Sequence, residues 1–198
     1  MGIPEIVSIN TSPGGIPKHP VAEVFVTVDG LAGDGRAHAK HLKSSRAVSL
    51  LDAELIATIR DEGYAVGPGV MGENLTTSGV DLLSLAPGTR LRFAGGVEIE
   101  MVEPRVPCFV LDAVHPDLQH AVRGRFGWMA RVVMPGVLHV GESVTVVGAG
   151  RCLAPVGLEN LGDPPGRPYE SGRPTAPTKG PMLDRDVVPR IVFIDDEP

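Results

Sequence analysis

The sequence predicts a mostly β protein with a few helices, in which short strands form a barrel or a sandwich. Two features indicate this class: several short runs alternate apolar and polar residues, and turn signals separate these runs at close spacing. Glycine and proline are abundant, at 25 and 19 of 198 residues, which favours many turns over long helices.

The strands are predicted in three stretches, each with alternating apolar residues and its own turn residues. These stretches are residues 21–30, ending in the turn pair Asp29-Gly30; residues 89–104, a hairpin with Gly95-Gly96 at its turn; and residues 128–148, broken at Pro135-Gly136 and Gly141-Glu142.

One amphipathic helix is predicted between Asp52 and Gly63. Asp52 suits the N-cap position because its carboxylate can accept a backbone N–H, and Gly63 suits the C-terminal stop. The apolar residues that share one face and would cover the sheet are Leu55, Ile56 and Ile59. A shorter helix is predicted from Asp117 to Arg123.

The composition changes near Gly148, which predicts a folded domain over residues 1–148 and a tail over residues 149–198. The tail holds nearly half of the prolines and has no apolar period, so we expect it to be partly extended. Residues 191–194 form a short apolar run within it. This run is predicted to dock on its own domain or to add an edge strand, here or on a partner chain, which would allow a homodimer.

Bulk properties argue against several classes of protein. The net charge is −6 and no basic patch contains interleaved aromatic residues, so nucleic acid is a poor candidate partner. No window approaches the roughly 18 apolar residues of a membrane span, and the N-terminus lacks the features of a signal peptide. Cys108 and Cys152 lie in unlike surroundings and do not suggest a disulfide framework, so we expect a cytoplasmic protein with reduced thiols.

Cys108 is the first candidate functional residue. Pro104 and Pro107 stiffen its approach and favour a strand end or loop. Converging arginines would favour the thiolate, which is the nucleophile and the soft-metal ligand. The arginines near it in sequence are Arg105, Arg123, Arg125 and Arg131. The alternative is a buried structural cysteine, because free cysteine is among the most buried residue types.

A glycine-rich segment, residues 67–79, is the second candidate. Its glycines leave backbone amides open to an anion such as phosphate, and polar side chains follow them. These residues are Gly67, Gly69, Gly72, Glu73, Asn74, Thr76 and Thr77. No lysine follows in the Walker position, so a simple turn into a strand is the alternative.

A third candidate is a polar pocket formed ahead of the predicted helix by Asp34, His38 and Arg46, with a solvated loop as the alternative. His38 and His41 have a spacing that a helix could use for zinc, but no third ligand lies at a supporting distance. No serine lies in a G-x-S-x-G elbow, so a serine hydrolase is unsupported.

Five motifs follow one another between about Ile6 and Val147. They are G-L-x-G-D, R-x-V-S-L-L-x-x-E, P-G-x-x-G-E-N-L-T-T-x-G-V-D-L, P-C, and W-M-A-R-V-x-x-P-G-x-L-x-V-G-E-x-V. This order resembles the MOSC domain, the module found at the C-terminus of molybdenum cofactor sulfurases and in small stand-alone bacterial proteins. The resemblance implies a mostly β, barrel-like fold with a few helices.

The resemblance also implies a role for the cysteine. Cys108 would carry sulfur as a persulfide, or would lie as a ligand near the metal of a bound molybdenum-pterin cofactor. Other residues would order the pocket or hold the cofactor, and Arg123 or Arg131 would bind its phosphate. The ordering residues are Gly72, Glu73, Asn74 and Thr77, with Gly33, Asp34, His38 and Arg46 from the earlier motifs.

Three functions remain open. The first is a sulfur carrier. A cysteine desulfurase or another donor would supply the sulfur, because no lysine of the chain lies in a sequence context typical of a pyridoxal phosphate site. The acceptor would be a small molecule or a cofactor. A resolving thiol would then be Cys152 or come from another protein. The second is a molybdenum-cofactor-dependent reductase of N-hydroxylated compounds. The third is a non-catalytic module that binds the cofactor or another anion, with Cys108 packed in the barrel.

Overall fold

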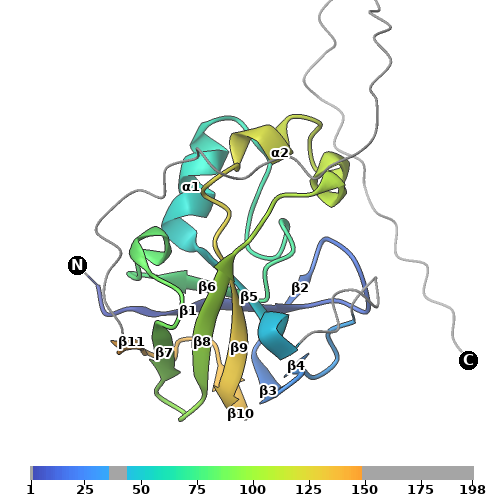
Figure 1. Ribbon diagram of the computed structural model, residues 1–198. Helices are drawn as coiled ribbons and strands as arrows, with labels where there is room; N and C mark the ends of the chain where they lie inside the picture. The colour runs from blue at the N-terminus through green and yellow to red at the C-terminus, as the bar shows by residue number, and fades with distance from the viewer. Residues whose placement is uncertain (1, 36–43, 149–198) are drawn as a thin grey trace, which may run out of the picture. The chain divides into compact units, whose positions relative to one another are not determined.

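Two β-sheets form the framework of the computed structural model, which describes residues 2–35 and 44–148 (Figure 1). The larger sheet has eight strands in the order β11-β7-β8-β9-β5-β6-β1-β2, and the smaller has the order β10-β3-β4. The strands are β1 (Glu5–Thr11), β2 (His19–Val21), β3 (Glu23–Thr27), β4 (Gly30–Leu31), β5 (Val48–Asp52), β6 (Leu75–Ser78), β7 (Arg90–Phe93), β8 (Glu98–Pro104), β9 (Trp128–Met134), β10 (Gly136–His139) and β11 (Val144–Val147).

The predicted class, mostly β with a few helices, is confirmed, but the predicted barrel is not. Among the described strands, β11 and β2 are the two edges of the larger sheet and do not pair with each other. Pro135 breaks the chain after β9, so β10 leaves the larger sheet and pairs with β3 instead. One isolated bridge, between Glu5 and Ser143, brings the start of β11 near β1 without closing the sheet.

The predicted hairpin is confirmed, because β7 and β8 pair antiparallel with Arg92 opposite Glu98. Gly96 sits in the turn with a φ of 93°, the left-handed region that glycine adopts without strain. Alternate residues of these strands are buried, so one face of the pair packs into the main hydrophobic core with β5 and β9. The apolar alternation seen in the sequence therefore marks the core-facing side.

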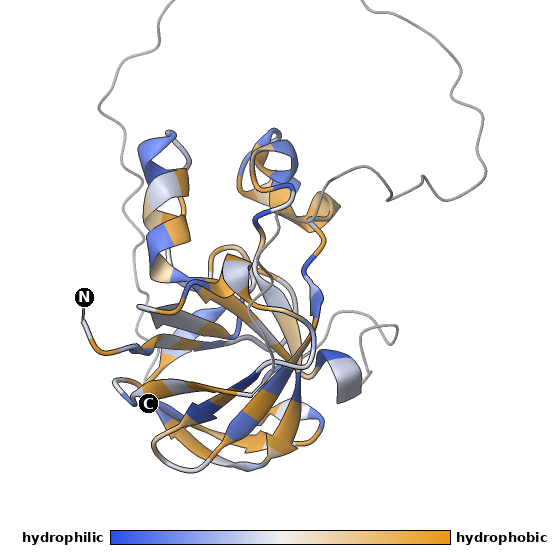
Figure 2. Ribbon diagram, turned by 60° about the vertical axis from the view of Figure 1, so that its left-hand side comes forward, coloured by the Kyte–Doolittle hydropathy of each residue, from blue (hydrophilic) through white to orange (hydrophobic). Residues whose placement is uncertain are grey.

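The predicted helix is confirmed as α1 (Ala53–Asp61), which connects the parallel strands β5 and β6. The Asp52 carboxylate accepts the N–H of Leu55 at 2.6 Å, and Gly63 follows the helix with a φ of 100°. Figure 2 shows polar and apolar residues alternating along α1. The apolar face, Leu55, Ile56 and Ile59, is buried in a second hydrophobic cluster.

The shorter helix, α2 (Leu118–Ala121), lies inside the predicted range and ends early, because Gly124 turns the chain with a φ of 77°. It joins α1 and a 3-10 turn, η4 (Phe109–Ala113), in the second cluster. Figures 1 and 2 show these three elements together at one end of the sheets. Two other 3-10 turns are η2 (Ser44–Arg46) and η3 (Leu82–Ser84).

No helix in the described ranges has both the length and the apolar character needed to cross a membrane. The predicted tail, with its run at 191–194, lies outside the described residues, as do His38, His41 and Cys152.

Candidate functional site

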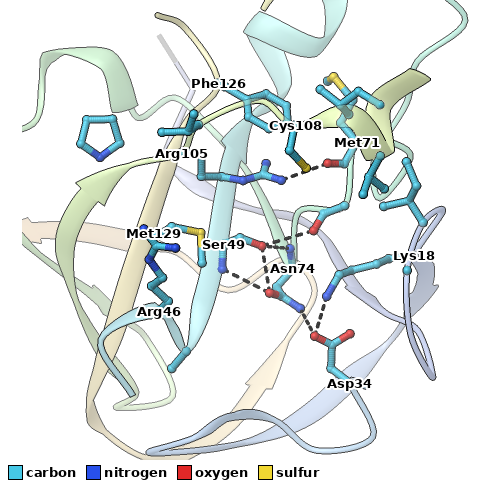
Figure 3. Close-up of a pocket in the computed structure, with 18 of the residues that line it drawn as sticks. Lys18, Asp34, Arg46, Ser49, Met71, Asn74, Arg105, Cys108, Phe126 and Met129 are labelled. Atoms are coloured by element: carbon cyan, nitrogen blue, oxygen red, sulfur yellow. Dashed lines mark hydrogen bonds and ion pairs between the residues drawn. The ribbon is translucent and has the colours of Figure 1, made fainter. Parts of the chain in front are cut away.

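Loops from distant parts of the sequence meet around a cavity of about 270 Å³ (Figure 3). This volume lies just below the roughly 300–1,000 Å³ typical of small-molecule sites. The cavity lies between the two hydrophobic clusters, since its lining draws on both β5 and the η4 region. The side chains that line this cavity include Ile16, Lys18, Asp34, Arg46, Ser49, Met71, Asn74, Arg105, Val106, Cys108, Phe126 and Met129.

Cys108 lines this cavity and is exposed to solvent. It occupies the N-cap position of η4, with extended backbone, and its carbonyl accepts the N–H of Leu111 at 3.0 Å. Its neighbours Val106 and Phe109 are 74% and 70% exposed. The alternative of a buried structural cysteine is therefore wrong, and the thiol can be reached from outside.

A buried polar network forms the wall opposite the thiol. Asn74 donates from its Nδ2 atom to Asp34 at 2.8 Å, and its Oδ1 atom accepts the hydroxyl of Ser49 at 2.9 Å. Lys18 forms an ion pair with the same Asp34 carboxylate at 2.5 Å. Because Asp34 and Asn74 are each held by more than one partner, they present fixed polar groups to the cavity.

Arg105 crosses the cavity beside Cys108 (Figure 3). Its guanidinium carbon lies 4.1 Å from the centre of the Phe126 ring, and its Nη2 atom donates to the Met71 carbonyl at 2.9 Å. Its Nη1 atom is buried and has no hydrogen-bond partner in the described part of the chain. Burial lowers the pKa of Arg105 to about 10, and the charges of Glu73 and Cys108 oppose this shift.

Glu73 lies beneath this region and is fully buried. Its Oε1 atom accepts the N–H of Gly69 at 2.5 Å and the hydroxyl of Thr76 at 3.2 Å, whereas its Oε2 atom has no hydrogen-bond partner among the described residues. Burial raises the pKa of Glu73, and the charge of Arg105 is the strongest factor opposing the rise. Glu73 and Arg105 therefore influence each other's charge, although no direct ion pair joins them.

Four of the predicted pocket residues line the cavity with Cys108: Asp34, Arg46, Gly72 and Asn74. Arg46 also forms an ion pair with Glu103. Two predicted backbone donors are already used, because Gly69 donates to Glu73 and the Gly72 N–H donates to the Gly69 carbonyl. The glycine-rich segment thus shapes the cavity through its turn rather than through these two amides.

Besides Gly33 and the buried Glu73, three predicted residues lie away from the cavity lining. Thr77 is buried in β6, and its hydroxyl has no hydrogen-bond partner among the described residues. Arg123 is exposed after α2, and Arg131 pairs with Glu100 on the surface of β8 and β9 at 2.8 Å. None of the three is among the described residues that line the cavity, so this placement gives no support to Arg123 or Arg131 as anion binders.

Sequence patterns did not predict five further side chains of the cavity, those of Lys18, Ser49, Met71, Phe126 and Met129. Ser49 stands in the R-x-V-S-L-L motif, so that motif carried a signal for it. Lys18 follows a glycine- and proline-rich stretch with no recognisable pattern. Its place depends on the contact between residues 18 and 69, whose backbones join through a 2.9 Å hydrogen bond.

The fold and the cavity together define a class of protein: a mostly β domain that presents an exposed thiol beside cationic side chains. The family model of the MOSC domain matches residues 37–145, more than half of the 198 residues. The chain therefore belongs to the MOSC domain family.

Individual relatives are distant. A protein of Gibberella moniliformis (strain M3125 / FGSC 7600) described as "Reductase" is 30% identical over 134 residues, covering 63% of this chain and 24% of that protein. The chain thus spans about a quarter of the length of this curated relative.

Solved structures share the fold. The YuaD protein from Bacillus subtilis superposes with a TM-score of 0.62 at 20% identity, covering 72% of this chain and 94% of that one. YiiM from Geobacillus stearothermophilus has a TM-score of 0.60 at 27% identity, covering 73% and 75%. YiiM from Escherichia coli has a TM-score of 0.60 at 24% identity, covering 76% and 72%.

Proposed function

We propose that this cavity binds the molybdenum cofactor and that Cys108 is a ligand of its metal. The observation that carries the proposal is the meeting of one exposed thiol with three cationic side chains in one cavity: Lys18, Arg46 and Arg105 line it together with Cys108. Thiolates suit soft metals, and cationic side chains suit a phosphate group. Membership of the MOSC family supports this assignment.

The cavity residues fit such a group. No cluster of three His, Cys, Asp or Glu side chains that could hold a metal ion occurs within residues 2–35 and 44–148. A cofactor that brings its own ligands would complete the coordination of a metal at Cys108. The Ser49–Asn74–Asp34 network offers fixed hydrogen-bonding groups to a polar heterocycle. Apolar side chains of Met71, Phe126 and Met129 line the same cavity and suit a flat ring.

The cofactor would supply two-electron redox chemistry at molybdenum. The chain's own residues would hold it: Cys108 at the metal, the cationic side chains of the cavity at its anionic groups, and the apolar side chains around its ring system. The substrate class proposed is N-hydroxylated compounds, which such a protein would reduce. The relative described as a reductase is in keeping with this direction of chemistry.

Metal analysis tests the proposal. The protein is purified from a host that makes the cofactor, and molybdenum per chain is measured for the native chain, Cys108→Ala and Arg92→Met, whose arginine pairs with Glu98 on β7 and β8. We expect close to one molybdenum per chain in the native protein and in Arg92→Met, and a large loss in Cys108→Ala. Little molybdenum in the native chain, in a host with proven cofactor supply, would refute the proposal.

A second candidate function is a sulfur carrier, favoured by the exposure of Cys108 between the exposed side chains of Val106 and Phe109. A donor persulfide, such as that of a cysteine desulfurase, would pass its outer sulfur to the Cys108 thiolate. The product would be a Cys108 persulfide and the donor's thiolate. We propose that this exchange takes place in the cytoplasm, with a partner supplying the sulfur.

Intact-mass spectrometry separates the two candidates. After incubation with a cysteine desulfurase and cysteine, a carrier gains about 32 Da, the mass of one sulfur atom, which a reductant removes. The gain must vanish in Cys108→Ala. If Cys108→Ala instead keeps both full cofactor affinity and the activity of the native chain, the protein is a binding module whose thiol has no role.

A further inference from the structure

We propose that Arg105 anchors an oxyanion beside Cys108, either the phosphate monoester of a bound cofactor or a free oxyanion such as inorganic phosphate. The inference rests on the proposed function in using the same cavity, but it does not require molybdenum. It assigns the anion to Arg105, which lines the cavity, and not to Arg123 or Arg131, which the sequence predicted and which do not line it.

The three cations of the cavity differ in how their charges are paired. Lys18 forms a direct ion pair with Asp34, and Arg46 forms one with Glu103. Arg105 makes no direct ion pair with any carboxylate in the described ranges, and its guanidinium donates one hydrogen bond there, to the Met71 carbonyl. Its positive charge is therefore the one that a ligand can pair with without displacing a carboxylate.

The unused donor of Arg105 is also buried. Nη1 has no partner among the described residues, and a buried N–H without a partner costs stability. Although burial lowers the pKa of Arg105, a value of about 10 keeps the guanidinium charged at neutral pH. A charge held away from water attracts an oppositely charged ligand more strongly than an exposed charge does.

Glu73 compensates the charge of Arg105 only in part. The two side chains interact electrostatically, yet the Oε2 atom of Glu73 and the Nη1 atom of Arg105 each lack a hydrogen-bond partner in the described structure. Glu73 directs its bonded oxygen to Gly69 and Thr76 instead. The carboxylate thus stabilises the buried arginine from a distance and leaves a donor available.

The geometry of the guanidinium suits an oxyanion. The guanidinium carbon lies over the Phe126 ring, 4.1 Å from its centre, and this contact uses none of the guanidinium N–H groups as conventional hydrogen-bond donors. Figure 3 shows the guanidinium next to the Cys108 side chain. Because Nη1 lies below the surface, an oxyanion reaches it after a rotation of the guanidinium, which exchanges the Met71 carbonyl for the ligand.

Calorimetric titration with inorganic phosphate at low ionic strength tests the proposal. The variants are Arg105→Met, Arg105→Lys and the control Arg92→Met, an exposed arginine outside the cavity. We expect Arg105→Met to bind phosphate roughly ten- to hundred-fold more weakly, the range for a charged hydrogen bond, and Arg105→Lys to keep part of the affinity. Arg92→Met should match the native chain. Equal affinity in native chain and Arg105→Met, or no binding to the native chain, would overturn the proposal.

A measurement on the native chain alone guards against misfolded variants. Phosphate seated at Arg105 should slow alkylation of Cys108 by iodoacetamide, because both residues line one cavity. Chloride at equal ionic strength should not do so. Alkylation that is indifferent to saturating phosphate would contradict the site whatever the variants show.

Molybdenum loading then identifies the source of the oxyanion and separates the two proposals. Loss of both molybdenum and phosphate binding in Arg105→Met supports the phosphate of the cofactor, whereas loss of phosphate binding alone supports a free oxyanion. If the native chain takes up no molybdenum but binds phosphate through Arg105, the proposed function fails and the oxyanion site stands.

Discussion

The guanidinium of Arg105 lies on the ring of Phe126, 4.1 Å from its centre, in a cavity that also contains the thiol of Cys108. Phe126 belongs to the hydrophobic cluster beneath the helices, whereas Arg105 directly follows β8. The contact therefore ties the helical end of the molecule to the larger sheet at the cavity.

Gly72→Ala should damage the cavity as well as the fold. Gly72 has a φ of +83°, and a Cβ there would lie 2.8 Å from a side-chain methyl of Ile16, another cavity residue. Urea denaturation should show a loss of about 1–3 kcal/mol from the backbone conformation alone, with a further loss from the clash.

Gly88→Ala is the matched control for this change. Gly88 has nearly the same φ, +85°, but a Cβ there meets nothing within 4 Å. It should show the backbone cost without the clash and should leave phosphate affinity unchanged. Equal stability and equal phosphate affinity of the two variants would mean that Ile16 moves aside freely.

Asn74→Ala should destabilise the chain by about 2–4 kcal/mol, because it leaves several buried groups without partners. Asn74 is buried and its side chain bonds to Ser49, Asp34 and the Asn10 carbonyl. Gln119→Ala is a suitable control, because this partly exposed amide makes one side-chain hydrogen bond among the described residues, to Asp112. If urea unfolds the two variants at the same concentration, the network contributes little.

Glu73→Gln should change how stability depends on pH. Burial raises the pKa of Glu73 in the folded state, so its stabilising contribution is fully present below the ordinary glutamate pKa of about 4.5. That contribution is lost as pH rises through the raised folded-state pKa. The free energy of unfolding of the native chain, relative to Glu73→Gln, should therefore fall as pH increases from about 4.

Glu54→Gln serves as the control for that pH series, since Glu54 is exposed and bonds only to the Gly79 amide in the described structure. The Glu73→Gln difference should decline with rising pH by more than the Glu54→Gln difference does. A rise of the Glu73→Gln difference with pH would mean that the charge of Arg105 outweighs burial in setting the pKa of Glu73.

Local signals predicted most of the fold. Gly96 specified a turn, Asp52 specified a helix start, and the alternation of residues 90–104 specified a hairpin, because each depends on backbone chemistry within a few residues. Closure of the sheet depends on which distant strands pair. The local pattern could not show that β10 pairs with β3 after Pro135. A barrel was therefore predicted, although the two sheets are open.

The candidate site shows the same contrast between residues that local motifs predict and residues whose place depends on long-range contacts. The motifs that brought Cys108, Asp34 and Asn74 together were readable in order along the chain. Lys18 was missed because its place depends on a long-range contact with Gly69. Arg131 was chosen for its charge, although the burial of Ala130 and Val132 on either side places it on the outer face of β9.

X-ray absorption at the molybdenum edge tests the central claim most directly, because it reports the atoms bound to the metal. Native protein loaded in a cofactor-producing host is compared with Cys108→Ser reconstituted to equal molybdenum content. We predict that the native spectrum contains one more sulfur ligand than that of Cys108→Ser. Identical sulfur coordination in the two spectra would show that Cys108 does not bind the metal.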